Sequence, residues 1–133
     1  MMLALVSANQ AVVAQQVTLT VVVKGVKDAQ GKVSVALYGT EKDFMKNLLA
    51  GKTTVAKEGD VQVVFENIPQ GSYAVSVMHD ENQNDKLDTN MIGIPKEGYG
   101  FSNDAVGSFG PPSFEKARFA LKGSQTIVVT IRY

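Results

Sequence analysis

The feature that most constrains the fold is a succession of short segments rich in β-branched residues and separated by turn-forming residues. Valine, isoleucine, threonine and aromatic residues favour strands, and apolar side chains at every second position indicate a strand with one buried face. Six or seven such segments at regular spacing predict an all-β, antiparallel sandwich with one short helix. We expect strands at 17–23, 32–38, 60–68, 73–80, 113–121 and 125–133, and a further short strand at 52–59.

The expected helix occupies residues 40–50. Thr40 can cap it, Asp43 follows three residues later, and Phe44 and Leu48 fall on one helical face. Because this is the only helical pattern, we do not expect parallel strand pairs with helical crossovers.

Two turns are predicted from local chemistry. The segment 28–31, Asp-Ala-Gln-Gly, predicts a hairpin that joins the strands 17–23 and 32–38. Between the strands 60–68 and 73–80, Pro69 fixes φ and Gly71 is expected to supply a positive φ.

Length and charge limit the function classes. A chain of 133 residues suits one domain with a sizeable core. The 13 basic and 13 acidic residues cancel, which gives no basic patch for nucleic acid. Cysteine is absent from the sequence, which excludes disulfides, thiolate zinc sites and a cysteine nucleophile. No apolar run of about 18 residues occurs, so no membrane span is expected.

The first residues look like a processing sequence. Residues 1–14 are apolar, small and uncharged, and Val12-Val13-Ala14 has the small-residue pattern that precedes a signal-peptidase cut. This predicts a remnant of a signal peptide at 1–14, a mature domain at 15–133, and a periplasmic or secreted location. The basic start of a signal peptide is missing, and the alternatives are an apolar first strand or a translation start assigned too late.

Side-chain oxygens are concentrated in the stretch 79–90, HDENQNDKLDTN. Numbered from Asp80, oxygen donors recur at positions 1, 3, 5 and 9, and position 7 donates its backbone carbonyl in calcium loops. Ca²⁺ takes about six to eight oxygen ligands, which this alternation would aim at one centre. The predicted Ca²⁺ ligands are Asp80, Asn82, Asn84, Lys86 and Asp88.

Two departures weaken this match to a calcium loop. Position 6 is Asp85 instead of glycine, and position 12 is Met91 instead of a bidentate glutamate. Glu81, Asp85, Asn90 or Glu97 would have to complete the site, and affinity would be about 10⁻⁴–10⁻³ M. The alternative is a polar turn without metal, because Asn and Asp side chains also bond to nearby backbone.

Three runs together resemble a family of small, exported bacterial proteins of unknown function: GKVSVALYGTEKDF, FENIPQGSYAVSVMHDENQNDKLDTNMIGIPKEGYGFSNDA and GPPSFEKARFAL. The resemblance extends from about residue 17 to residue 133. It implies an envelope or extracellular location and a prealbumin-like or immunoglobulin-like sandwich, and it supplies no catalytic residues. The run FENIPQGSYAVSVMHD also resembles a hairpin that is common in prealbumin-like and carboxypeptidase-regulatory-like domains, where the tyrosine that corresponds to Tyr73 packs back over the turn at Pro69 and Gly71.

His79 is the only histidine and is followed by Asp80 and Glu81. A histidine beside a carboxylate can act as a general base, but no nucleophile-elbow pattern accompanies it. The simpler interpretation is a structural histidine that donates to a loop carbonyl.

The stretch 93–114 places several aromatic residues among Gly and Pro. Tyr99 and Phe101 are candidates for a ligand platform that binds glycan or peptide. Alternatively, the rings anchor a long connection at one end of the sandwich, because ordering such a connection needs apolar contacts.

From these observations we expect a non-enzymatic binding or accessory module with an unidentified protein or glycan partner in the cell envelope. The alternatives are a small hydrolase that uses His79 with nearby carboxylates, and a purely structural domain without a ligand.

Overall fold

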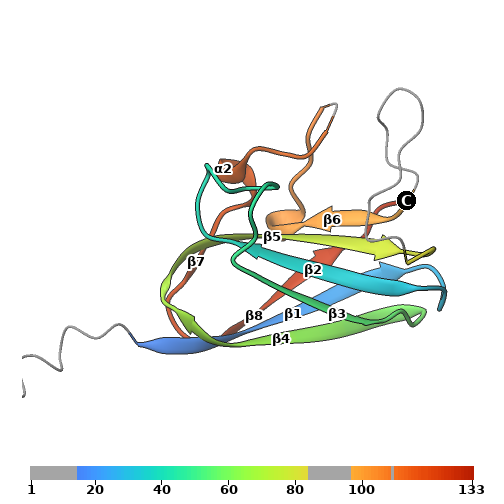
Figure 1. The fold of residues 1–133 in the computed structure, drawn as a ribbon, viewed down its shortest axis with the longest axis horizontal. Helices are drawn as coiled ribbons and strands as arrows, with labels where there is room; N and C mark the ends of the chain where they lie inside the picture. The colour runs from blue at the N-terminus through green and yellow to red at the C-terminus, as the bar shows by residue number, and fades with distance from the viewer. Residues whose placement is uncertain (1–14, 84–96, 109) are drawn as a thin grey trace, which may run out of the picture.

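The computed structural model describes residues 15–83, 97–108 and 110–133 as two packed β-sheets (Figure 1). The smaller sheet has the order β4-β1-β8, and the larger sheet has the order β3-β2-β5-β6, with β7 paired to the beginning of β5. The prediction of an all-β sandwich is confirmed, with eight strands in the described residues where six or seven were expected. The strands are Gln16–Val26 (β1), Lys32–Tyr38 (β2), Ala50–Val55 (β3), Gly59–Pro69 (β4), Gly71–Asp80 (β5), Tyr99–Phe101 (β6), Phe119–Leu121 (β7) and Gln125–Thr130 (β8).

The main core lies between the two sheets. Along most of β1, β2 and β5, every second side chain is buried, as the period of a half-buried strand requires. Fully burying one Val, Leu or Phe side chain stabilises the fold by about 1.5–3 kcal/mol. Core residues from the two sheets include Leu19, Val21, Val23, Val61, Val63, Phe65, Val33, Val35, Leu37, Val75 and Val77.

The connection between β1 and β2 crosses from one sheet to the other, so the predicted hairpin is wrong. β1 pairs with β4 and β8, whereas β2 pairs with β3 and β5. The expected turn chemistry is present, because Asp28 Oδ1 accepts the Gln30 N–H at 3.0 Å. Gly31 has φ 72°, and a Cβ there would overlap the carbonyl oxygen of Asp80 on β5. A local turn therefore forms without deciding which strands pair.

One strand pair is parallel, against the expectation of a purely antiparallel arrangement. β1 and β8 run in the same direction, with Val21 opposite Ile127. The chain between these two strands passes through the five-stranded sheet, so their connection needs no crossover helix.

The helix expected at residues 40–50 does not form. The Asp43 N–H donates to Thr40 Oγ1 at 3.1 Å, which is the predicted cap. However, Met45 has φ 63° in the left-handed region, which interrupts the helix after its first turn. The segment instead makes consecutive turns until β3 begins at Ala50.

The strand expected at 113–121 is also wrong over its first half. A short helix, α2, occupies Phe114–Ala117, and only Phe119–Leu121 forms a strand. Ser113 caps the helix, since its hydroxyl accepts the Lys116 N–H at 3.3 Å. A serine cap therefore decides the structure where apolar alternation suggested a strand.

The turn between β4 and β5 follows the sequence prediction in part. Tyr73 packs back over it and donates its hydroxyl to the Pro69 carbonyl at 2.6 Å. Burial raises the pKa of the Tyr73 hydroxyl. The positive φ predicted at Gly71 is wrong, and a left-handed residue occurs earlier, at Asn67 with φ 59°.

A second apolar group, the aromatic cluster, forms on the outer side of the five-stranded sheet. In Figure 1, α2 and the segment between β2 and β3 lie on this side, away from the three-stranded sheet, and β6 is an edge strand of the five-stranded sheet itself. The Phe44 ring packs edge-on against the rings of Tyr38 and Phe114, with centroids 5.3 and 5.8 Å apart. The cluster comprises Ala74, Phe101, Phe114 and Ala117, with Phe44, Tyr99 and Ala105 packed against them.

Within the described residues, no helix has the length and apolar character needed to cross a membrane.

Candidate functional site

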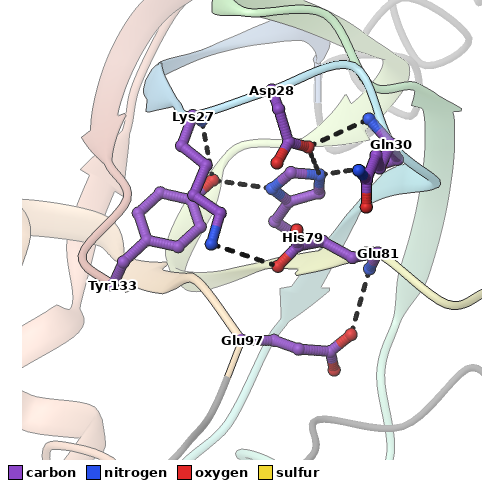
Figure 2. A network of polar contacts seen from close by, with 7 residues as sticks. All are labelled: Lys27, Asp28, Gln30, His79, Glu81, Glu97 and Tyr133. Carbon is purple, nitrogen blue, oxygen red and sulfur yellow. Dashed lines mark hydrogen bonds and ion pairs between the residues drawn. The ribbon is translucent and has the colours of Figure 1, made fainter.

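His79 lies at the end of β5 with its side chain completely buried. Its Nδ1 is 2.6 Å from the Tyr133 hydroxyl, and its Nε2 is 2.7 Å from the carbonyl oxygen of Gln30 (Figure 2). A carbonyl oxygen can only accept, so Nε2 carries the proton, and in the neutral ring Nδ1 accepts from Tyr133. This geometry matches the structural interpretation of the histidine, which donates to a loop carbonyl.

Tyr133, the last residue, connects His79 to the end of β1. Its hydroxyl accepts the Lys27 N–H at 3.0 Å, and the Lys27 ammonium lies 5.0 Å from the ring centroid. The same ammonium is 3.7 Å from Glu81 Oε1. Burial raises the pKa of the Tyr133 hydroxyl; the negative charges of Glu81 and Asp28 also raise it, and the Lys27 N–H opposes them.

The two ends of the connection between β5 and β6 are bonded to each other. The His79 N–H donates to the Gly98 carbonyl at 2.8 Å, and the Glu81 N–H donates to Glu97 Oε2 at 3.0 Å. The Glu97 carboxylate is buried, with 6% of the residue exposed. Glu97, one of the suggested completions of the calcium site, therefore contacts the stretch after Asp80 through this hydrogen bond, and its role as a metal ligand stays a prediction. We call this group the polar base: Lys27, Asp28, Gln30, His79, Glu81, Glu97 and Tyr133 (Figure 2).

Among the residues that the structure describes, one trio has the composition of a metal site. One ligand atom from each of Asp28, His79 and Glu81 lies within 4.8 Å of the others. Such a nitrogen and oxygen set suits zinc or a related transition metal better than calcium. Both histidine nitrogens already have hydrogen-bond partners, and Asp28 Oδ1 accepts from Gln30. The hydrogen bonds account for this arrangement without a metal.

The structure describes only two of the five predicted calcium ligands. Asp80 is completely buried at the end of β5, whereas Asn82 is exposed. Both residues have interaction partners. The predicted ligands Asn84, Lys86 and Asp88, and the suggested completions Asp85 and Asn90, lie outside the described residues. The calcium site therefore stays a prediction.

The two residues of the predicted ligand platform have different environments. Phe101 is 5% exposed and packs in the aromatic cluster, its ring centroid 6.3 Å from that of Phe44. Tyr99 is half-buried, so of this pair it has more surface to offer a partner. Phe114 is also buried, which supports anchoring by aromatic residues. Phe109 lies outside the described residues.

Sequence reasoning missed Lys27, Gln30 and Tyr133. They contact His79 or its partners from the connection after β1 and from the end of the chain. Lys27 and Tyr133 belong to no motif, and Gln30 lies in the predicted turn 28–31, which gave no sign of its contact with His79. The contact between Lys27 and Tyr133 follows from the pairing of β1 with β8. Only a correct sheet topology could have indicated these neighbours.

Comparison with known proteins gives one match. The family model described as "Uncharacterized protein conserved in bacteria (DUF2141)" matches residues 21–129, from within β1 to within β8. No curated protein and no solved structure matches the chain.

Proposed function

The chain belongs to the DUF2141 family of bacterial proteins, whose description names no activity, and we propose a non-enzymatic binding or accessory module exported to the envelope. In this proposal Ca²⁺ fastens the connection between β5 and β6. Its partner would be a protein or glycan of the envelope.

The observation that carries the non-enzymatic assignment is the burial of His79. It is the only histidine of the chain, and its ring has no exposed surface. A general base has to reach the proton that it removes, at hydrogen-bond distance or through one water molecule. The alternative of a hydrolase built on His79 and nearby carboxylates would require Tyr133 or Gln30 to leave the ring.

The calcium proposal is supported by the acids at the two ends of the connection. Asp80 and Glu97 are buried and both have interaction partners, and Glu81 Oε1 lies 3.7 Å from the Lys27 ammonium. Burying carboxylates is unfavourable unless positive charge or hydrogen bonds offset the loss of water. Hard oxygen donors at alternating positions are the ligands that Ca²⁺ prefers, and Asp80 and Asn82 begin this alternation.

Thermal and urea unfolding with calcium or with a chelator tests this proposal. Calcium at about ten to a hundred times Kd would add about 1.4–2.7 kcal/mol if it binds only the folded chain. Asp88→Asn is expected to abolish this gain, and Asp60→Asn, at an exposed acid on β4, should keep it. A calcium gain that survives both Asp80→Asn and Asp88→Asn would show that the proposed ligand set is wrong.

Export is proposed from residues 1–14, which lie outside the described residues. Expression of the full chain in a bacterium, followed by mass measurement of the periplasmic protein, should find a mature chain that starts at Gln15. Recovery of only uncleaved protein in the cytoplasm would contradict the proposal.

The finer fold type, prealbumin-like or immunoglobulin-like, is also proposed. It is supported by Tyr73, near the start of β5, whose hydroxyl bonds back to the Pro69 carbonyl at the corner between the sheets. Tyrosine corners of this kind occur in immunoglobulin-like sandwiches. An experimental structure with a different strand connectivity from those two fold types would contradict this assignment.

A further inference from the structure

The outer face of the five-stranded sheet has a trough, which follows from the small residues that the sequence places there. Side chains on this face meet in two rows that cross β3, β2, β5 and β6, and three of the four central members, Ser34, Ala36 and Ser76, are small. Such positions leave space above the sheet that Val or Phe would fill. The rows are Thr53–Ser34–Met78–Tyr99 and Gly51–Ala36–Ser76–Phe101.

Larger side chains border this trough. The groove is lined by Tyr99 and Phe101 of β6 and by Met45 and Leu48, which come from the segment between β2 and β3. Met45 is 41% exposed and Leu48 is 56% exposed. The result is a groove of about 470 Å³, within the range of small-molecule sites at roughly 300–1,000 Å³.

The groove is mainly apolar, with polar groups at defined points. The hydroxyls of Tyr38 and Ser76 lie 3.5 Å apart in its lining. Lys52 is the only residue with a charged side chain at neutral pH among the described residues that line it. Methionine side chains, here Met45 and Met78, adapt to apolar ligands of varied shape. An apolar trough with one cation complements a molecule that has an apolar body and one anionic group.

We propose that this groove binds a small amphipathic anion with an unbranched alkyl chain, of the fatty-acid class. The alkyl chain lies over Ala36 and Ser76, in contact with the rings of β6 and with Leu48. The carboxylate faces Lys52. A protein partner is less suitable, because stable protein interfaces bury about 800 Å² on each side, which is more surface than a groove of this size offers. The site contains neither the polar base nor the predicted calcium ligands, so it stands independently of the calcium proposal.

Calorimetric titration with monomeric sodium decanoate is the direct test. We expect saturable one-to-one binding with Kd on the order of 10–100 µM, from typical affinities per ligand atom. Ala36→Phe fills the floor and should weaken binding by about tenfold or more. Thr20→Phe is the matched control, because Thr20 is a half-buried position on β1, the central strand of the other sheet, and does not line the groove. It should bind decanoate like the unchanged protein.

Charge reversal tests the position of the anion. Lys52→Glu should weaken decanoate binding by about three- to tenfold and leave decan-1-ol binding unchanged, as expected for one partly exposed charge pair. Lys122→Glu, at an exposed lysine outside the groove, should change the binding of neither ligand.

If the Ala36→Phe variant does not fold, Leu48→Ser at the exposed border of the groove takes its place. It should weaken the binding of both decanoate and decan-1-ol.

Three results would overturn the proposal. The first is the absence of saturable decanoate binding. The second is equal binding by the groove variants and their controls. The third is binding to anionic lipid vesicles without binding to monomeric decanoate, which would assign the surface to a membrane. Each result is independent of the calcium melts, so the two proposals can fail separately.

Discussion

The two ends of β5 are held by different chemistry. Near its start, the aromatic cluster packs Ala74 against Phe101, Phe114 and their neighbours. At its end, the polar base surrounds His79 with hydrogen bonds of 2.6 and 2.7 Å. Both groups attach connecting segments to the same sheet.

The two groups differ in how much their stabilising contacts depend on the direction in which atoms approach each other. Apolar packing depends on volume and contact area, so a core tolerates substitutions that conserve volume. A buried hydrogen bond depends on atom type and angle, and removing one partner leaves the other unsatisfied. We therefore expect the aromatic cluster to respond mainly to size and the polar base mainly to chemistry.

The largest effect is expected from truncation in the aromatic cluster. Phe101→Ala should destabilise the protein by about 3–4 kcal/mol, because the ring is buried and leaves a cavity. Phe101→Leu should cost less than about 1.5 kcal/mol, because the neighbouring rings can close most of the space. Urea unfolding measures both values. Equal losses for the two variants would mean that ring geometry, and not volume, holds this end.

At the polar base, an apolar substitution of similar size should not be tolerated. His79→Leu is expected to cost about 2–3 kcal/mol, because the Gln30 carbonyl loses its donor and Tyr133 loses its acceptor. His79→Gln, which keeps a donor and an acceptor, should lose about half as much. A smaller loss for His79→Leu than for Phe101→Leu in urea unfolding would contradict the comparison.

The longer strands β1, β2, β4 and β5 were predictable because their signal is local. Alternation along residues 32–38 alone sets the bounds of β2 and its buried face. Pairing is not local, and neither the hairpin assigned to residues 28–31 nor the direction of β8 beside β1 could be decided from turn chemistry. The aromatic anchoring by Phe101 and Phe114 was among the predicted alternatives, since burial follows from residue type.

The polar base was predictable only in part. His79 and Glu97 stood out because one is the only histidine and the other is an acid near the oxygen-rich stretch. Tyr133 and Lys27 carry no such signal, since their roles depend on the pairing of β8 with β1 and on the crossing between sheets after β1. Away from the polar base, the turn at Met45 was not predictable either, because it needs a left-handed backbone conformation that methionine disfavours.

Ser102 tests whether the aromatic end also contains a directional contact. Its buried hydroxyl accepts the Val75 N–H at 2.9 Å and donates to the Ala117 carbonyl at 2.5 Å. Ser102→Ala should cost about 1–2 kcal/mol, because the Val75 N–H is left buried without that acceptor. Ser72→Ala, at an exposed position of β5, should change stability by less than about 0.5 kcal/mol. Similar values for the two serines would show that packing alone holds this end.

The smallest effect at neutral pH is expected from Tyr133→Phe. The change removes the donor to the buried His79 Nδ1, but Tyr133 is 51% exposed and water can replace its hydroxyl as the partner of the Lys27 N–H, so the loss should be about 1 kcal/mol. Its pH dependence is more informative. Because burial raises the pKa of Tyr133 above 10.0 in the folded chain, folding favours the neutral phenol. That contribution is complete below the unfolded pKa and is lost as the pH rises through the folded value.

Urea unfolding measured from pH 8 to pH 11 would isolate this contribution. Stability should fall above about pH 10, the ordinary pKa of tyrosine, and Tyr133→Phe should make that fall shallower. Tyr73→Phe should also make it shallower, because burial raises the pKa of the Tyr73 hydroxyl in the same way. If Tyr133→Phe left the alkaline slope unchanged, ionisation of Tyr133 would not be linked to folding. The Lys27 N–H, which opposes the raised pKa, would then balance burial, and the polar base would be held through His79 and Gln30 instead.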